Sequence, residues 1–182
     1  KCGNCPTGHR TISDIQQTYP DQIVPVAIHC GFDSEPSTSG DKYSYDFRTP
    51  AGNEMEEDLD IPYYPVGLVN SLNRDDLDIP ASWQQFTEQF INETPAIGMQ
   101  LINDYNDTTR KTCIHIKTQY LEELSGDYNL VVYILESGII QWQKDYEASP
   151  SDVEDYEHNH VLRTSVTNTW GTQLSAGQVA AD

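Results

Sequence analysis

The hydrophobic positions in the first half of the chain follow helical spacing and then change to a short apolar run. Apolar residues recur every three or four positions over residues 5–19 until Pro20 ends the pattern, which predicts an amphipathic helix of about four turns. The β-branched run over residues 22–29 predicts a strand buried on both faces. A second amphipathic helix is predicted over residues 80–92. A helix followed by a buried strand indicates an α/β arrangement.

The second half of the chain has a different hydrophobic pattern, because its apolar residues recur with period two or in short runs. The predicted strands cover residues 96–102, 112–118, 128–135, 139–144 and 158–166. Residues 128–135 are apolar on both faces and are expected to lie centrally in a sheet. Ser137 and Gly138 are expected to turn this strand into a hairpin with residues 139–144.

Short strands separated by turns, as in the second half, are typical of a small immunoglobulin-like β-sandwich. The predicted fold class is therefore α/β plus all-β. Thr94-Pro95 ends the second helix and marks the boundary between the two parts. The first domain is predicted over residues 1–94 and the second, the β-sandwich, over residues 95–182.

Two cysteines three positions apart, Cys2 and Cys5, stand at the start of the first predicted helix. Residues at this spacing bring two sulfurs close enough to bridge, and the helix N-terminus stabilises a thiolate. Cys2 would then be the nucleophile and Cys5 the resolving partner of a thiol–disulfide oxidoreductase. A purely structural disulfide is the alternative. A zinc site is disfavoured, because Cys30 and Cys113 stand alone and supply no second ligand pair.

Pro65 directly precedes an apolar stretch over residues 66–70, and an aromatic residue, Tyr64, stands before it. In a redox α/β fold, a cis proline at such a place lies against the cysteine pair and presents its backbone to an extended peptide. Aromatic residues favour the cis form of the following bond, so we expect Tyr64–Pro65 to be cis. Tyr64 and Val66 are then the candidate substrate-binding residues. The alternative is an ordinary trans turn.

Three histidines are weaker candidates for functional-site residues than the cysteine pair. His29 ends the strand predicted over residues 22–29, where ligand groups of open α/β sheets gather, but a cap on the strand end explains it equally well. Cys30 is interpreted as a small core residue. His158 and His160, two positions apart on a predicted strand, would share one face, a geometry that metals use. Since no further ligand follows at suitable spacing, a structural role is favoured over a metal site.

Composition limits the classes of partner. The chain has 29 acidic and 10 basic residues, and its net charge of −19 excludes nucleic acid and anionic membrane surfaces as partners. Five carboxylates within residues 54–60 lack the spacing of a calcium loop and are read as a solvated face. No nucleophile elbow or glycine-rich phosphate loop occurs, so hydrolase and nucleotide-binding functions gain no support. No cofactor is expected. No apolar stretch approaches a membrane span, and no signal peptide is expected within these residues.

Four sequence stretches, residues 1–6, 26–29, 64–70 and 156–163, occur in this order in the twenty-eight-kilodalton outer-membrane lipoprotein family of Gram-negative bacteria, which the chain resembles over nearly its whole length. The last stretch is the most specific. The resemblance implies a thioredoxin-like domain followed by a β-sandwich. It also implies a lipoprotein with a signal sequence and a lipid-bearing cysteine upstream, located in the outer membrane or on the cell surface, with that anchor as the one membrane contact.

Three features depart from a working thioredoxin. The chain begins one residue ahead of Cys2, so the first strand of that fold is missing. Lys1 replaces the aromatic residue that commonly precedes the first thiol. Residues 73–78 are too acidic to form the expected hairpin strand. Two functions therefore stay open: thiol–disulfide exchange with a peptide or protein, or a non-enzymatic surface adhesin or binding module with an inert bridge. A third interpretation is an accessory subunit of an outer-membrane complex, and the oligomeric state stays open.

Overall fold

Proline occupies the first turn of the three longer helices, where the helix needs no backbone N–H. In this computed structural model, which describes residues 1–70 and 73–181, these are α1 (Cys5–Thr18), α3 (Pro50–Leu59) and α4 (Pro80–Phe90). The Thr49 hydroxyl oxygen caps α3 by accepting a hydrogen bond from the Gly52 N–H, at 3.0 Å. Two short helices, α2 (Gly31–Ser34) and η1 (Arg74–Asp76), complete the set. The helices predicted over residues 5–19 and 80–92 are confirmed, whereas the sequence did not predict α3.

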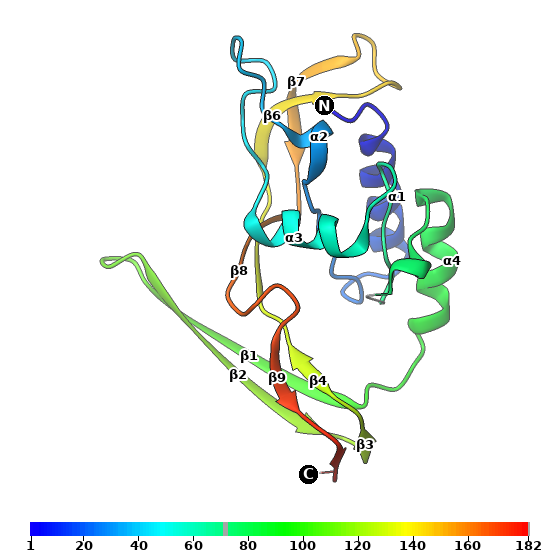
Figure 1. The fold of residues 1–182 in the computed structure, drawn as a ribbon, viewed down its shortest axis with the longest axis vertical. Helices are drawn as coiled ribbons and strands as arrows, with labels where there is room; N and C mark the ends of the chain where they lie inside the picture. Colours follow the sequence, from blue (N-terminus) through cyan, green and yellow to red (C-terminus); the bar gives the residue numbers. More distant parts are fainter. Residues whose placement is uncertain (71–72, 182) are drawn as a thin grey trace. The chain divides into compact units, whose positions relative to one another are not determined.

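Helices α1 and α4 pack against each other (Figure 1). Ile15 on α1 and Trp83 on α4 are buried, with 4% and 8% of their surface exposed. At the end of α1, the Tyr19 hydroxyl donates a hydrogen bond to the Glu88 carboxylate of α4, at 3.2 Å. The apolar spacing that predicted these two helices therefore also marks the faces by which they pack.

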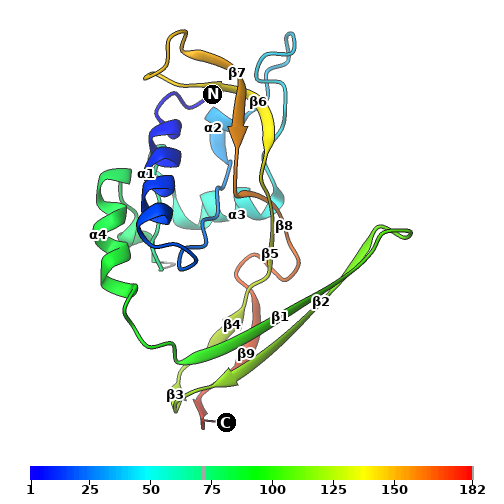
Figure 2. The same cartoon turned by 180° about the vertical axis from the view of Figure 1, so that it is seen from behind.

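Four strands of the second half form one long, bent hairpin (Figure 2). They are β5 (Tyr133–Glu136), β6 (Ile139–Lys144), β7 (Asp152–His158) and β8 (Val161–Ser165). β5 pairs antiparallel with β8 and β6 pairs antiparallel with β7, so the chain runs out along β5 and β6 and returns along β7 and β8. At the bend, the Gly138 N–H donates to the Asn159 side chain and the His160 N–H donates to the Ser137 hydroxyl, both at 2.9 Å.

The predicted hairpin between residues 128–135 and 139–144 is wrong. Ser137 and Gly138 make a bend within one arm of the long hairpin, and the true turn is the loop over residues 145–151. The predicted central strand is divided into β4 (Tyr128–Leu130) and β5, which pair with different strands. Gly138 has a φ of +79°, which suits a bend as well as a turn, so the local sequence does not distinguish the two.

The main core lies between α3 and β8. Ala51 and Met55 of α3 and Leu162 of β8 are buried together. Partly buried side chains pack around them: Val26, Tyr133, Leu135 and Trp170. The strand predicted over residues 22–29 is reduced to one parallel bridge between Ala27 and Val161. Val24 is 83% exposed, so the prediction of burial on both faces is wrong there, because a strand is buried in that way only where helices cover both faces of a sheet.

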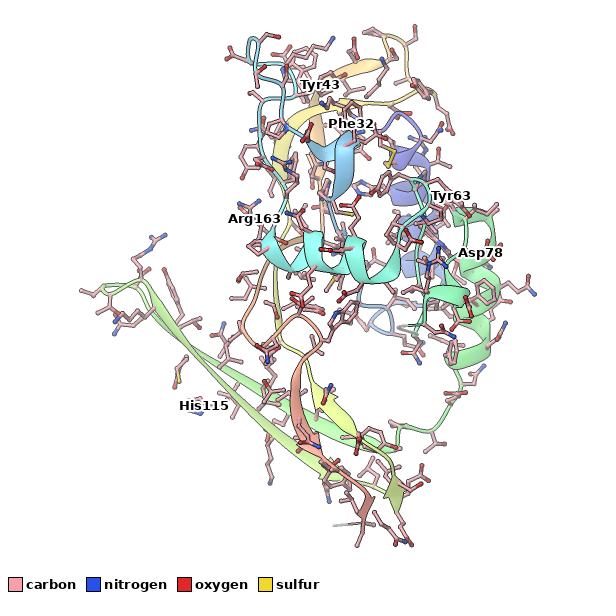
Figure 3. All side chains as sticks on the ribbon, viewed as in Figure 1. Phe32, Tyr43, Tyr63, Asp78, His115 and Arg163 are labelled. Atoms are coloured by element: carbon pink, nitrogen blue, oxygen red, sulfur yellow. A yellow bond between two sulfur atoms is a disulfide. The ribbon has the colours of Figure 1, made fainter. Side chains whose placement is uncertain are left out.

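A long two-stranded ribbon dominates a separate part of the chain. β1 (Ile97–Asn106) pairs antiparallel with β2 (Lys111–Tyr120), and His115 stands on β2 (Figure 3). The strands predicted over residues 96–102 and 112–118 are thus confirmed and extended. The shorter pairs are β3 (Leu124–Ser125) with β10 (Gln178–Val179), and β4 with β9 (Thr172–Ser175).

Contacts divide the chain into two compact units. The first comprises Lys1–Asn92 and Val131–Gly171, and the second comprises Glu93–Leu130 and Thr172–Asp182. Within residues 1–70 and 73–181 every sheet has two strands, so helices and small antiparallel sheets make up a mixed α/β and β-rich structure. The thioredoxin-like and immunoglobulin-like assignments stay predictions, as does the domain boundary at residues 94 and 95. Residue 182, which ends the predicted second domain, lies outside the described residues.

Candidate functional site

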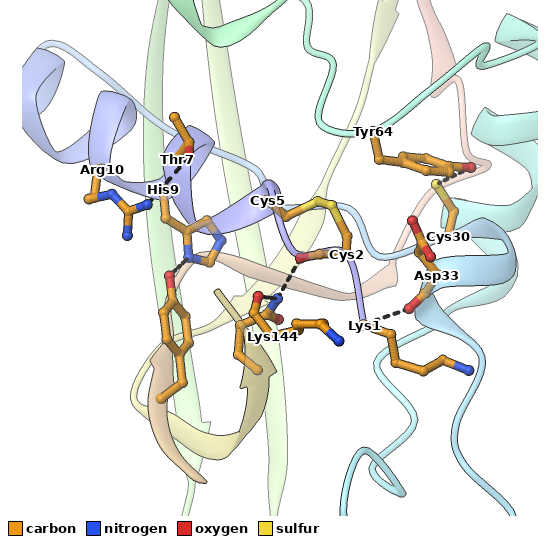
Figure 4. Close-up of a disulfide and its surroundings, with 12 residues drawn as sticks. Lys1, Cys2, Cys5, Thr7, His9, Arg10, Cys30, Asp33, Tyr64 and Lys144 are labelled. Atoms are coloured by element: carbon orange, nitrogen blue, oxygen red, sulfur yellow. Dashed lines mark hydrogen bonds between the residues drawn. A yellow bond between two sulfur atoms is a disulfide. The ribbon is translucent and has the colours of Figure 1, made fainter. Parts of the chain in front are cut away.

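Cys2 and Cys5 form a disulfide at the start of α1 (Figure 4). Cys5 is the first residue of the helix, and the Cα atoms of the two cysteines are 5.4 Å apart. Asn4 between them is exposed, and its carbonyl oxygen accepts a hydrogen bond from the Thr7 N–H at 3.1 Å. The free N–H groups and the dipole at a helix N-terminus favour a thiolate there. The bridge that the spacing predicted is therefore present, while the roles of nucleophile and resolving thiol stay predictions.

Pro65 lies against the same helix. The Tyr64–Pro65 peptide bond is cis, as the sequence predicted. A Cβ atom built on Gly8 would be 3.5 Å from the Cβ atom of Pro65. Gly8 comes three residues after Cys5, so the two positions share one side of α1. Val66, the other candidate for substrate binding, follows Pro65 and is half-buried. The tertiary structure thus brings the proline segment to the helix that begins at the disulfide.

The side chain of Tyr64 joins the proline segment to Cys30 (Figure 4). Its hydroxyl donates a hydrogen bond to the Glu56 carboxylate and lies 4.0 Å from the Cys30 sulfur. Burial raises the pKa of the Cys30 thiol to about 11, and the Glu56 charge acts in the same direction. Cys30 is therefore a buried, protonated thiol at neutral pH, which agrees with its interpretation as a small core residue.

The end of β6 and the loop that follows it hold the backbone between the two cysteines. The Gln143 side-chain amide donates to the Cys2 carbonyl oxygen at 2.8 Å, and the Tyr146 N–H donates to the Gly3 carbonyl oxygen at 2.9 Å. A Cβ atom built on Gly3 would be only 2.5 Å from the Tyr146 ring, so glycine is the residue that lets this ring approach.

Arg10 on α1 adds ion pairs to the same loop. Its guanidinium group lies 2.8 Å from the Asp145 carboxylate and 2.9 Å from the Glu147 carboxylate. The hydrogen bond from Arg10 holds the pKa of the buried Asp145 carboxyl below its usual range. The Thr7 hydroxyl also donates to Glu147, at 2.9 Å. Sequence reasoning missed these contacts, because Arg10 and Asp145 are 135 positions apart and no motif links them.

Three histidines, His9, His29 and His158, gather with Phe47 and Tyr156. The His158 ring lies 4.5 Å from Phe47 and 4.9 Å from Tyr156, and it lies 5.8 Å from His29 between ring centroids. His29 stacks on Phe47 at 4.7 Å, and the Nδ1 atom of His9 lies 2.9 Å from the Tyr156 hydroxyl. His29, which the sequence placed either at a ligand-binding edge or as a strand cap, therefore belongs to a packed ring cluster.

Three ring nitrogens of this cluster have no hydrogen-bond partner among the described residues. Both nitrogens of His158 and the Nδ1 atom of His29 are buried, with no hydrogen-bond partner among the described residues. Burial lowers the pKa of His29 to about 3 and that of His158 to about 4. Burial also lowers the pKa of His9. All three imidazoles are therefore neutral at pH 7.

His158 and His160 do not share a strand face, so the geometry predicted for that pair is wrong. His158 ends β7 and is buried, with 1% of its surface exposed. His160 stands in the bend before β8 with a φ of +59°, which breaks the alternation of side chains along a strand. In the parts of the chain that the structure describes, no group of three His, Cys, Asp or Glu side chains is placed to hold a metal ion.

Comparison with known proteins places the chain in one family. Residues 53–181, more than two thirds of the chain, match the family model for outer membrane protein Omp28. No curated protein and no solved structure matches the chain. The matched range includes Pro65 and the loop over residues 145–151, and it begins after Cys2 and Cys5. Among the described helices none is both long and apolar enough to cross a bilayer.

Proposed function

Since the chain belongs to the outer membrane protein Omp28 family and is a protein of the cell envelope, we propose that it carries out thiol–disulfide exchange there through Cys2 and Cys5. The observation that carries the proposal is the disulfide at the start of α1 together with a cis proline packed on the same helix. The cell envelope of Gram-negative bacteria lies outside the reducing cytosol, where such a pair can cycle. A thioredoxin-like arrangement of the first domain is part of this proposal.

In the reduced protein, the Cys2 thiolate attacks one sulfur of a substrate disulfide. A bond forms between Cys2 and that sulfur, and the other substrate sulfur leaves as a thiolate that takes up a proton. The Cys5 thiolate then attacks the Cys2 sulfur, forms the bridge and releases the second substrate thiol. The protein loses two electrons and two protons, and the substrate gains them. Pro65, with Tyr64 and Val66, presents the backbone along which the substrate peptide lies.

A second candidate function is a non-enzymatic adhesin or binding module, and the β1–β2 ribbon favours it. Met99, Leu101 and Tyr105 lie on one face of β1 and are 71%, 63% and 54% exposed. Exposed apolar side chains that gather on one face are typical of interaction surfaces. In this function the Cys2–Cys5 bridge only stiffens the start of α1.

Trapping separates the two functions. Cys113 is a free, exposed thiol that would capture disulfides by itself, so every variant carries Cys113→Ser. We expect Cys5→Ser to accumulate a mixed disulfide between Cys2 and a model peptide disulfide, because the thiol that resolves it is gone. Intact-mass spectrometry before and after reduction measures the adduct. The matched control, Cys2→Ser with Cys5→Ser, is expected to form none.

The reduction potential gives an independent measurement. An exchanging pair is expected to have a potential above about −300 mV and a Cys2 pKa below about 8.5. A potential below about −300 mV, together with no adduct in the Cys5→Ser variant, would identify the bridge as structural and leave the binding module as the function.

A further inference from the structure

Among the described residues of the first compact unit, two cations have no carboxylate within 4.0 Å, although the chain has an excess of acids. The chain has 10 Lys and Arg residues against 29 Asp and Glu residues. Within the described part of the chain, five of these cations form ion pairs within 4.0 Å: Arg10, Lys42, Arg48, Arg74 and Arg163. Among the described residues of the first unit, that leaves Lys1 and Lys144 without a carboxylate at this distance. In so acidic a chain, two unpaired cations in one unit call for a physical explanation.

Both unpaired cations stand beside exposed aromatic rings. The Lys1 ammonium lies 5.4 Å from the centroid of the Phe32 ring, which is 78% exposed. The Lys144 ammonium lies 5.7 Å from the centroid of the Tyr146 ring, which is 62% exposed. Contact with a ring face holds a cation in place without neutralising it. The charges of Lys1 and Lys144 therefore stay available to an external anion.

The two lysines lie beside the disulfide (Figure 4). Lys1 directly precedes Cys2. Lys144 is also held near Cys2, since its neighbour Gln143 donates to the Cys2 carbonyl oxygen. Tyr146, which carries Lys144 on its ring, donates its N–H to the Gly3 carbonyl oxygen. Phe32 stands on α2 (Figure 3), whose Asp33 carbonyl oxygen accepts a hydrogen bond from the Lys1 main-chain nitrogen at 2.7 Å.

Local charge differs here from the charge of the whole chain. Arg10 forms ion pairs with Asp145 and Glu147, the two carboxylates of the loop beside the disulfide. Asp152 faces Lys144 across β6 and β7 and forms an ion pair with Lys42. With Asp33, Asp152 and Lys42 counted as well, these four cations and four carboxylates cancel, whereas the whole chain carries −19. At physiological ionic strength the Debye length is about 8 Å, so the distant carboxylates are screened and the nearby lysines act on a bound ligand.

We propose that the substrate of this site is an extended acidic peptide, with Asp or Glu side chains next to its reacting cysteine. The two lysines meet these carboxylates, and the Phe32 and Tyr146 rings cover the adjoining apolar parts of the peptide. This inference rests on the proposed exchange at Cys2 and Cys5, because the reacting sulfur is what brings the peptide to the two lysines.

The test compares three synthetic peptides that differ only in the residues beside one cysteine, which carries a 2-pyridyl disulfide. The flanking residues are Glu, Gln or Lys, and release of pyridinethione by the reduced Cys113→Ser protein gives the rate. We expect the Glu peptide to react about fivefold faster than the Gln peptide, and the Lys peptide to react more slowly than either, because two exposed charge pairs form or are lost. The preference is expected to shrink as salt is raised, a measurement that needs no substitution.

Matched variants locate the preference. Lys1→Gln with Lys144→Gln is expected to abolish the difference between the Glu and Gln peptides. Lys111→Gln with Lys117→Gln removes the same charge from the β1–β2 ribbon and is expected to keep the difference. Equal rates for the Glu and Gln peptides in the parent protein, or a preference that survives loss of Lys1 and Lys144, would overturn the inference while leaving exchange in place.

Failure of the proposed function has a different signature. If no peptide reacts, exchange itself is absent. The inference is then decided on the oxidised protein with a fluorescently labelled, cysteine-free Glu peptide. Fluorescence anisotropy measures whether that peptide binds more tightly than its Gln counterpart and whether the difference disappears without Lys1 and Lys144. Equal binding of the two peptides would overturn the acidic-peptide inference as well.

Discussion

Lowering the pH from 7 to 5 is expected to reduce the free energy of unfolding by about 4 kcal/mol, roughly 2 kcal/mol from each of His29 and His158. Burial holds their folded-state pKa values at about 3 and about 4. In the unfolded chain both titrate near 6.5, so below that pH the unfolded state binds the additional protons. The stability that the two neutral rings contribute is complete above about pH 6.5 and is lost as the pH falls toward the folded-state values.

His158→Leu tests this expectation at the more deeply buried of the two rings. Leucine fills a similar volume, does not titrate, and removes two ring nitrogens that have no partner among the described residues. Urea unfolding followed by circular dichroism at pH 7, 6 and 5 measures the stability. Between pH 7 and pH 5, we expect the free energy of unfolding of the variant to fall by about 2 kcal/mol less than that of the parent protein. Most carboxylates titrate below this range, so they contribute little to the difference.

The same substitution at the exposed His115 of β2 is the control, because it removes an imidazole that is not buried. A His158→Leu variant with an unchanged pH dependence would show that the buried ring is already protonated at pH 7 or that it does not control acid stability.

Replacing Trp83 with alanine is expected to lower the free energy of unfolding by about 3–5 kcal/mol, the usual cost of removing a large buried aromatic ring. Its ring lies 3.2 Å from a Cβ atom built on Gly8 and 2.8 Å from one built on Gly67, so it fills the space between α1 and the segment after Pro65. Its ring N–H also donates to the Asp78 carbonyl oxygen at 2.9 Å. The substitution leaves a cavity and removes one of two hydrogen bonds that the Asp78 carbonyl oxygen accepts, the other coming from the Gly67 N–H at 3.0 Å.

Trp142→Ala provides the matched control for Trp83→Ala. Trp142 is half-buried and interacts with the Tyr43 ring and the Lys42 ammonium, at 6.4 Å and 5.4 Å. Because water already reaches part of the Trp142 side chain, its removal leaves no closed cavity. We therefore expect the free energy of unfolding to fall by only about 1 kcal/mol. Equal losses for the two variants, measured by urea unfolding, would contradict the role of Trp83 as the side chain that joins α1, α4 and the Pro65 segment.

The redox candidates could be read from the sequence because their geometry is local. A spacing of three residues at a helix start determines that Cys2 and Cys5 can bridge, whatever the rest of the chain does. The cis bond before Pro65 likewise follows a local rule, the effect of an aromatic residue on the bond that follows it. Local rules were less reliable for the strands. The bend at Ser137 and Gly138 uses the same residues as a hairpin turn, and only the pairing of β5 with β8 distinguishes the two.

The sequence by itself determined the two amphipathic helices, the strongly acidic charge and the cysteine pair, since each follows from residues that are close neighbours along the chain. Only the tertiary structure decided that Gln143 and Tyr146 hold the backbone between the cysteines and that His29 and His158 share one aromatic cluster. These partners are more than 120 positions apart, and neither periodicity nor residue propensity says which distant segment a side chain will meet. Packing of the whole chain decides which of these contacts form, because each contact must stabilise the fold by more than the entropy that is lost in closing a long loop.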